Sequence, residues 1–294
     1  MTKCHYFSDR YVDIQSTNAL LPVKNTFSLI LIKCDILIMN INTVRHILTN
    51  DVLLCLNETD VVEVLTEKGM EALTVSFTPE FINPNLDFSL IRSAQYAELQ
   101  EKHLYPGFDL FLRRSVVYTG MLPINEEFAS ILYRVFREVD KQVHDQPDGK
   151  WSCRSRSNLF SVFEIAGQAY LDLTEKPSSK KSVLQNVIRY MRVHVSEHIT
   201  VEQLCNRFNV NRTTLTTQFK KQVGFTPIEY LIEYRIKRCR YDLAFTELTL
   251  KEISGKYSFF DSTYFSKMFS ARTGMTPHQY RNEMRNARPD KSVV

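Results

Sequence analysis

The sequence predicts an α+β protein, in which an N-terminal β-barrel with trailing helices precedes an all-α C-terminal domain of two helix-turn-helix units. Three observations lead to this prediction. A motif recurs after about fifty residues within 200–280, short apolar runs with strand periodicity fill 25–82, and apolar stripes at helical spacing fill 125–173. A repeat of this length is typical of one supersecondary unit built twice.

The two copies of the repeat share their helix start and stop signals. Gly224 and Gly274 are placed to end a helix, because glycine adopts the left-handed conformation after a helix without cost. Each is followed by Thr-Pro and then by a Glu or Gln three residues after the Thr, which predicts a capped helix start. Further capping boxes are predicted at Thr200 and Thr249. Each copy therefore predicts a helix, a sharp break and a second helix.

Upstream of each break, the spacing of apolar residues predicts a helix-turn-helix. The first copy has an apolar stripe over 201–208, a break at 209–211 and a second helix over about 212–223. In the second copy the turn falls at 258–260, and Asp261 is expected to cap the helix that follows. Both units thus have the order of a helix-turn-helix motif.

The second helix of each unit leaves one polar face free. Short hydroxyl side chains, Arg and Lys can reach base edges and phosphates without steric bulk, so this face is a candidate for contact with double-stranded DNA. For each single residue, the alternative is a solvated helix position that does not contact DNA. The candidates are Arg212, Thr213, Thr216, Thr217 and Lys220 in the first unit and Ser262, Thr263, Ser266 and Lys267 in the second.

Two runs of residues carry a resemblance to a known family. They read Ile-Ser-x-x-x-Ser-Phe-x-Asp-x-x-Tyr-Phe-Ser-Lys-x-Phe at 253–269 and Gly-x-Thr-Pro-x-x-Tyr-Arg at 274–281. With them, the stretch from about 183 to 285 resembles the AraC/XylS family of bacterial transcription regulators. The resemblance implies seven helices, in which a long helix over about 227–245 joins the two units. It also implies that the two recognition helices enter adjacent major-groove segments about 34 Å apart.

This chain departs from the family pattern at two positions of the second unit. Ser258 stands where the family usually has Gly, and Ser270 stands where a Lys is common. Serine adopts the expected turn conformation only at some cost, and the second exchange removes a phosphate contact. The second unit is therefore expected to bind DNA less firmly than the first.

The charge of the chain is unevenly distributed. Residues 180–294 hold 20 Lys and Arg against 10 Asp and Glu, a net charge of +10, whereas the rest holds 17 against 23, a net charge of −6. The total is +4. A basic C-terminal part behind an acidic N-terminal part is what a phosphate-binding module attached to another kind of domain should have.

The N-terminal half has the periodicity of short strands with polar breaks, which predicts a small antiparallel barrel or jelly roll. The AraC/XylS resemblance implies a cupin-like barrel here. No two of the histidines at 5, 46, 103 and 144 have the close spacing of metal-binding cupins, so neither a metal nor another cofactor is expected. The predicted strands are 27–32, 36–41, 43–48, 52–56, 61–65 and 72–77.

Two long apolar stripes predict helices over about 125–144 and 157–173. They can pack on the barrel or on a second subunit, and in the family such helices often mediate dimerisation, so a homodimer is expected. The resulting domains are 1–175 for regulation and dimerisation, β-rich to about 120 and helical over 124–175, a linker at 176–182, and the DNA-binding domain at 183–287.

The function expected from these patterns is that of a cytoplasmic transcription regulator, an activator that binds promoter DNA and contacts RNA polymerase, without catalytic activity or a membrane span. A further expected partner is a small-molecule effector of unidentified chemistry. The alternative role of the residues that are candidates for its pocket is packing in the core. Two other functions stay open: a protein-interaction regulator without base readout, and a metalloenzyme that uses either the barrel or the H-x-x-E-H pattern at 194–198. The candidate pocket residues are Tyr6, Phe7, Tyr11 and Phe27.

Overall fold

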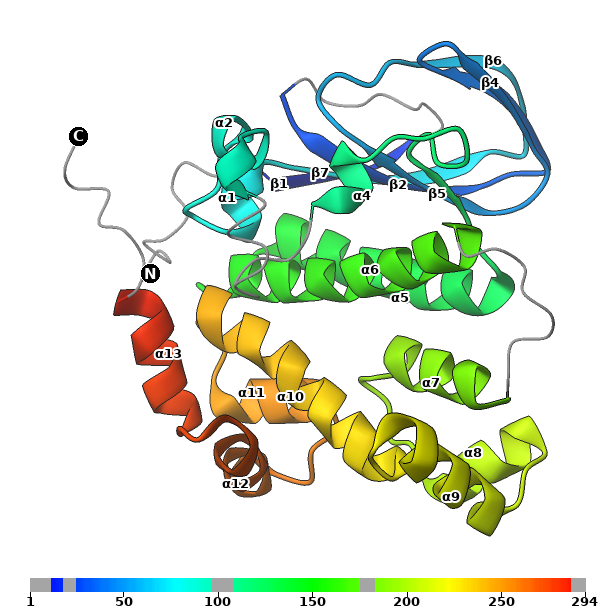
Figure 1. Cartoon of the computed structure of the whole chain (residues 1–294). Helices are drawn as coiled ribbons and strands as arrows, with labels where there is room; N and C mark the ends of the chain where they lie inside the picture. Colours follow the sequence, from blue (N-terminus) through cyan, green and yellow to red (C-terminus); the bar gives the residue numbers. More distant parts are fainter. Residues whose placement is uncertain (1–11, 18–24, 97–107, 175–182, 287–294) are drawn as a thin grey trace. The chain divides into compact units, whose positions relative to one another are not determined.

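The computed structural model describes residues 12–17, 25–96, 108–174 and 183–286, and the chain divides into two compact units, Met1–Lys176 and Pro177–Val294 (Figure 1). The first unit contains two antiparallel sheets and several helices, whereas the described part of the second is helical. The predicted α+β class is therefore confirmed. The linker expected at 176–182, and Tyr6, Phe7 and Tyr11, lie outside the described residues.

The strands of the first unit follow the predicted runs closely. They form one sheet in the order β1-β7-β2-β5-β8 and a second in the order β4-β3-β6, so the described strands make two sheets and not one closed barrel. Two short or polar strands, β1 and β8, escaped prediction. The strands are β1 (Val12–Thr17), β2 (Phe27–Lys33), β3 (Ile36–Ile41), β4 (Val44–Leu48), β5 (Val52–Leu56), β6 (Val62–Lys68), β7 (Glu71–Phe77) and β8 (Met121–Pro123).

The core of the first unit lies on both faces of its five-stranded sheet. On one face Ile30 and Leu54 share an apolar cluster with Leu37 of the smaller sheet. On the other face the sheet meets helices, and Phe77 contacts Phe163 at 5.8 Å between ring centroids. Burial on both faces explains why β5 and residues 29–32 of β2 are continuous apolar runs without alternation. The helices are α1 (Pro79–Ile82), α2 (Phe88–Ile91), α4 (Asp109–Leu112), α5 (Glu126–Asp145) and α6 (Trp151–Thr174).

Phe27, a candidate for an effector pocket, belongs to this core. Its side chain is 0% exposed, and its ring lies 4.6 Å from that of Phe111 and 5.1 Å from that of Phe88. Aromatic rings at these separations stabilise a core beyond their buried area. The alternative of core packing therefore holds for Phe27.

The second unit has seven helices within 183–286, the number that the family resemblance implies. Its first four helices enclose an apolar core that includes Leu184, Leu204, Leu215 and Phe219. Over the described residues of the whole chain, every helix is too short or too polar to cross a membrane. The helices are α7 (Val183–Val193), α8 (Val201–Phe208), α9 (Arg212–Val223), α10 (Pro227–Phe245), α11 (Leu250–Lys256), α12 (Ser262–Thr273) and α13 (Pro277–Asn286).

Candidate nucleic-acid interface

Helices α8 and α9 form the first helix-turn-helix, with signals at each boundary. Thr200 and Gln203 form the predicted capping box at the start of α8. Asn209 ends α8 with a φ of 48°, in the left-handed region that Asn tolerates better than most residues. Asn211 then caps α9, because its side-chain oxygen accepts a hydrogen bond from the Thr214 N–H at 2.7 Å. The break at 209–211 is therefore built from two asparagines.

Helices α11 and α12 repeat this arrangement. Thr249 and Glu252 form the predicted capping box of α11, and Asp261 caps α12 by accepting from the Tyr264 N–H at 2.7 Å. Ser258, at the predicted break, has a φ of 51°. Its hydroxyl donates to the backbone carbonyl of Ser196 at 2.7 Å, which offsets part of the cost of that conformation.

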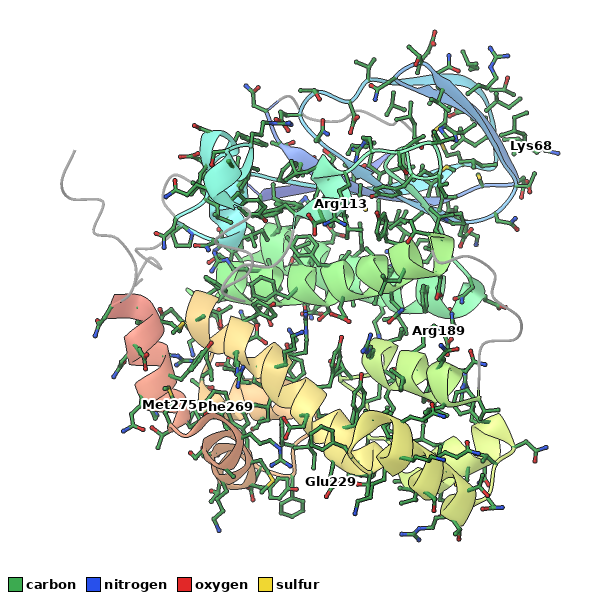
Figure 2. All side chains as sticks on the ribbon, in the orientation of Figure 1. Lys68, Arg113, Arg189, Glu229, Phe269 and Met275 are labelled. Atoms are coloured by element: carbon green, nitrogen blue, oxygen red, sulfur yellow. The ribbon has the colours of Figure 1, made fainter. Side chains whose placement is uncertain are left out.

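The two units also match in how each recognition helix ends. Gly224 and Gly274 both adopt the left-handed conformation, with φ values of 84° and 77°. The capping boxes predicted at Thr226 and Thr276 both form. The ring of Phe219 lies 5.5 Å from that of Tyr230, and the ring of Phe269 lies 5.5 Å from that of Tyr280. Phe269 is labelled in Figure 2. Phe219 and Phe269 are core residues, and the half-buried Tyr230 and Tyr280 pack each recognition helix against the helix after it.

On α9, most of the predicted contact residues are exposed. Leu215 and Phe219 are buried, while four of the five candidates are exposed and Thr216 is half-buried. A helix turns by about 100° per residue, so Thr213, Thr217 and Lys220 share the side away from the core, whereas Arg212 is exposed because it lies in the first turn. The exposed candidates are Arg212, Thr213, Thr217 and Lys220.

On α12, only two of the four candidate side chains are exposed. Thr263 and Lys267 are exposed, whereas Ser262 and Ser266 are half-buried. The Ser266 hydroxyl donates to the Ser262 carbonyl of its own helix at 2.8 Å. Ser266 thus has less capacity for an outside partner than its sequence position suggests.

Four further side chains at this surface were missed from the sequence. Gln218 and Lys221 on α9 are exposed, and counting 100° per residue would have placed Lys221 on the same face as Thr217. Phe260, just before α12, is 92% exposed and Tyr264 is 38% exposed. Both aromatics were absent from the candidates because only hydroxyl and cationic side chains were considered for contact with DNA.

The two recognition helices differ in charge. Helix α9 presents Arg212, Lys220 and Lys221, all exposed. Helix α12 carries Lys267 and Arg272, but Arg272 forms an ion pair with Glu233 of α10. The surface of α9 therefore has more positive charge to offer a phosphate backbone, as the departure at Ser270 led us to expect.

Arg235 on α10 connects the two units. Its guanidinium donates to the carbonyl of Val195 at 3.0 Å, to that of Ser258 at 3.2 Å and to that of Glu197. Two of these acceptors lie before α8 and one lies in the turn before α12. Burial lowers the pKa of Arg235 to about 10. One buried cation on the joining helix thus holds both the backbone that leads into the first helix-turn-helix unit and the turn of the second.

A second buried charge lies further along α10. The Asp242 carboxylate, 0% exposed, pairs with the Lys256 ammonium of α11 at 3.3 Å. Burial lowers the pKa of Lys256, and the negative charge of Asp242 opposes that shift. Burial also raises the pKa of the nearby Cys239 thiol well above its usual value. The pair therefore ties α11 to the joining helix inside the core.

The H-x-x-E-H pattern at 194–198 lies in the turn after α7, whereas a zinc-protease pattern needs both histidines on one helix face. The Nδ1 atom of His194 is 3.0 Å from Glu197, and its ring lies 4.2 Å from that of Tyr190. Within the described residues, no group of three or more His, Cys, Asp or Glu is placed to hold a metal ion.

Five of the six cysteines lie in the part of the chain that the structure describes, and all five are free thiols. Cys34, Cys55, Cys153 and Cys239 are buried and free. Cys205 is free and half-buried. Cys4 lies outside the described residues.

The C-terminal unit is similar in sequence to known helix-turn-helix proteins. A family model described as a helix-turn-helix domain matches residues 204–283. The uncharacterized HTH-type transcriptional regulator YdiP of Escherichia coli K12 is 26% identical over 152 residues, which are 51% of this chain and 50% of YdiP. The HTH-type transcriptional activator RhaR of Enterobacter sp. strain 638 is 30% identical over 131 residues, 44% of this chain and 46% of RhaR.

A solved structure also aligns with this region. The DNA-binding domain of AdpA, crystallised with a target DNA, is 25% identical, covers 37% of this chain and 99% of that one, and has a TM-score of 0.36. The chain spans about half the length of the two curated relatives named above. The segment that the family model matches includes both helix-turn-helix units described above, except the first three residues of α8. By its C-terminal unit, the chain is therefore similar to helix-turn-helix transcription regulators, in agreement with the AraC/XylS resemblance of the sequence.

Proposed function

We propose that this chain is a transcription regulator that binds double-stranded promoter DNA through two helix-turn-helix units. The observation that carries the proposal is the repeat of one unit fifty residues later, each copy with an N-capped recognition helix whose polar face is exposed. Recognition helices insert such a face into the major groove, and N-terminal residues of the helix contact base edges.

The residues proposed to bind DNA divide into two roles. Thr213, Thr216 and Thr217 on α9 and Ser262 and Thr263 on α12 are assigned to base edges, which hydroxyl groups can read as donors or acceptors. Ser266 is retained as a weaker candidate. The cationic side chains are assigned mainly to phosphates, which position the protein without specifying sequence. They are Arg212, Lys220, Lys221 and Lys267.

A salt titration of the full-length chain tests DNA binding. Each cation that neutralises a phosphate contributes about −0.9 to the slope of log affinity against log salt, so four contacts predict a slope of about −3 to −4. DNA selected from a random pool serves as the probe, and fluorescence anisotropy measures affinity. An affinity that is flat with salt would contradict the proposal.

Base readout is tested by Thr213→Ala combined with Thr216→Ala. We expect at least about tenfold loss of affinity for the selected site, with affinity for unrelated DNA unchanged, because hydroxyl contacts to bases carry sequence information. No change at the selected site would favour the alternative, a protein-interaction regulator that keeps the fold without base readout.

The rest of the proposed function rests on the N-terminal unit and the relatives. RhaR is named a transcriptional activator, which supports the proposal that this chain activates transcription. Contact with RNA polymerase is proposed as the means of activation. Residues 1–175 are proposed to sense an effector or to dimerise, 176–182 to link, and 183–287 to bind DNA. Sedimentation of the full-length chain, with and without DNA, tests the proposed homodimer.

A further inference from the structure

The residue just before the second recognition helix is a phenylalanine in solvent. Phe260 is 92% exposed and immediately precedes Asp261, the N-cap of α12. A hydrophobic residue at this position often packs against the fourth residue of the helix, here Phe265. In this chain Phe259 makes that contact, at 5.2 Å between ring centroids. The ring of Phe260 is therefore left outside the core of its unit.

A second aromatic side chain extends the same end of α12. Tyr264 lies in the first turn and is 38% exposed, and its ring is 6.3 Å from that of Phe259. Fifty residues earlier the corresponding positions hold Val210 and Thr214. The aromatic end is thus particular to the second unit, and it adjoins the exposed Thr263.

The chemistry of Phe260 restricts what it can recognise. Its ring has neither a hydrogen-bond donor nor an acceptor, so it cannot read the polar edge of a base, and it has no charge for a phosphate. In the major groove the one apolar group on a base is the C5-methyl of thymine. An exposed aromatic residue at the start of a recognition helix therefore matches a thymine methyl.

We propose that Phe260 is a specificity-determining residue, which packs against a thymine methyl in the half-site bound by the second unit, with Tyr264 beside it. The inference rests on the proposed DNA-binding function and deepens it. It gives the two units different modes of readout. Helix α9 reads bases through hydroxyl groups alone, whereas the start of α12 adds an apolar contact with a methyl group to the hydroxyl groups of Ser262 and Thr263.

Replacement of thymine by deoxyuridine tests this directly, because uracil lacks the C5-methyl and keeps every hydrogen-bonding group. A binding site is first selected from random DNA with the full-length chain. Each thymine of that site is then replaced singly by deoxyuridine, and fluorescence anisotropy at one fixed salt concentration measures the affinity of wild type and of Phe260→Ser.

For the wild type we expect about a fourfold loss of affinity at one or two thymines, all within one half of the site, since each lost methyl contact is worth about that factor. Phe260→Ser should bind the thymine and deoxyuridine versions equally at those positions. A matched control, Val116→Ser, removes an apolar side chain that is 103% exposed in the other unit, and should discriminate as the wild type does. Circular dichroism checks that both variants are folded.

Two results would overturn the inference and leave the proposed function standing. One is steep, salt-dependent binding to a selected site at which no thymine distinguishes wild type from Phe260→Ser. The other is a Phe260→Ser variant that keeps the discrimination but loses transcription activation, which would assign Phe260 to a protein contact. Selection of no sequence, with binding flat in salt, would overturn both proposals together.

Discussion

Ser258 is a residue whose conformation is set by its surroundings. Its φ of 51° lies in the left-handed region, which costs a non-glycine residue about 1–2 kcal/mol. Two contacts hold it there: its hydroxyl donates to the Ser196 carbonyl, and its own carbonyl accepts from Arg235. A glycine would adopt this conformation freely, but it could not make the first contact.

Substitutions at Ser258 separate these two effects. Ser258→Ala keeps the backbone cost and loses the hydroxyl contact, so we expect the C-terminal unit to lose about 1 kcal/mol of stability. Ser258→Gly loses the same contact but removes the backbone cost, so its stability should lie close to that of wild type. Urea unfolding measures both, and a glycine variant less stable than the alanine variant would show that the backbone conformation is not the deciding cost.

Lys220 is predicted to contribute affinity without specificity. Lys220→Ala should weaken binding to all DNA sequences alike and reduce the magnitude of the salt slope by about 1, because one phosphate contact is lost. Lys68→Ala, the same change on an exposed strand residue of the other unit, is the control and should leave the slope unchanged. A loss confined to the selected site would instead assign Lys220 to base readout.

At the scale of elements, capping boxes determine where the helices of the C-terminal unit begin. Thr226 and Glu229 start the joining helix α10, and the Glu229 carboxylate accepts from the Thr226 N–H and hydroxyl, both at 2.8 Å. These hydrogen bonds, the backbone one first, lower the pKa of Glu229. The second copy uses Gln279 in the same role, with a 2.8 Å contact to the Thr276 N–H.

This difference between the copies predicts a pH effect. Because the folded pKa of Glu229 is depressed, its contribution to stability is present above the unfolded pKa of about 4.3 and is lost as pH falls through the folded value. Glu229→Gln copies the second unit and should remove this part of the acid dependence while α10 stays helical. Thermal unfolding at pH 6 and at pH 3 measures it, and an unchanged acid dependence in the variant would contradict the assignment.

We predict that Arg235 makes the most important side-chain contacts between the segment before α8 and the turn before α12. Arg235→Ala leaves three buried or half-buried carbonyls without its N–H donors, so we expect the C-terminal unit to lose at least about 3 kcal/mol. Lys237→Ala, two residues along the same helix and exposed, should have little effect. Equal losses for the two variants in urea unfolding would mean that helix propensity, and not the three contacts, decides.

At the scale of the whole molecule, the chain consists of two units with separate cores. Residues 177–294 contain their own apolar cluster and their own buried charges, so they should fold without the first unit. We expect a fragment from Pro177 to Val294 to unfold cooperatively in urea and to bind the selected DNA with the same salt slope as the full-length chain. A fragment that is unfolded, or whose slope differs, would show that the first unit contributes to the interface.

How much the sequence could predict depended on the kind of signal. Helix boundaries marked by local chemistry were predicted within one or two residues, as at Thr226, Gly224 and Asp261, because caps act over three or four neighbouring residues. Strands β2 to β7 were likewise visible as apolar runs between polar breaks. Strand β8 was not, because its three residues become a strand only by pairing with β5, a distant partner.

The surface proposed to contact DNA was likewise predictable only in part. The polar side of α9 followed from helical periodicity, which any amphipathic helix shows in its sequence. The exposure of Phe260, the internal hydrogen bond of Ser266 and the pairing of Arg272 with Glu233 did not. The sequence by itself determined two copies of a capped helix-turn-helix and their register. Only the tertiary structure decided which side chains of that surface are free for a partner, because that depends on contacts between residues far apart in the chain.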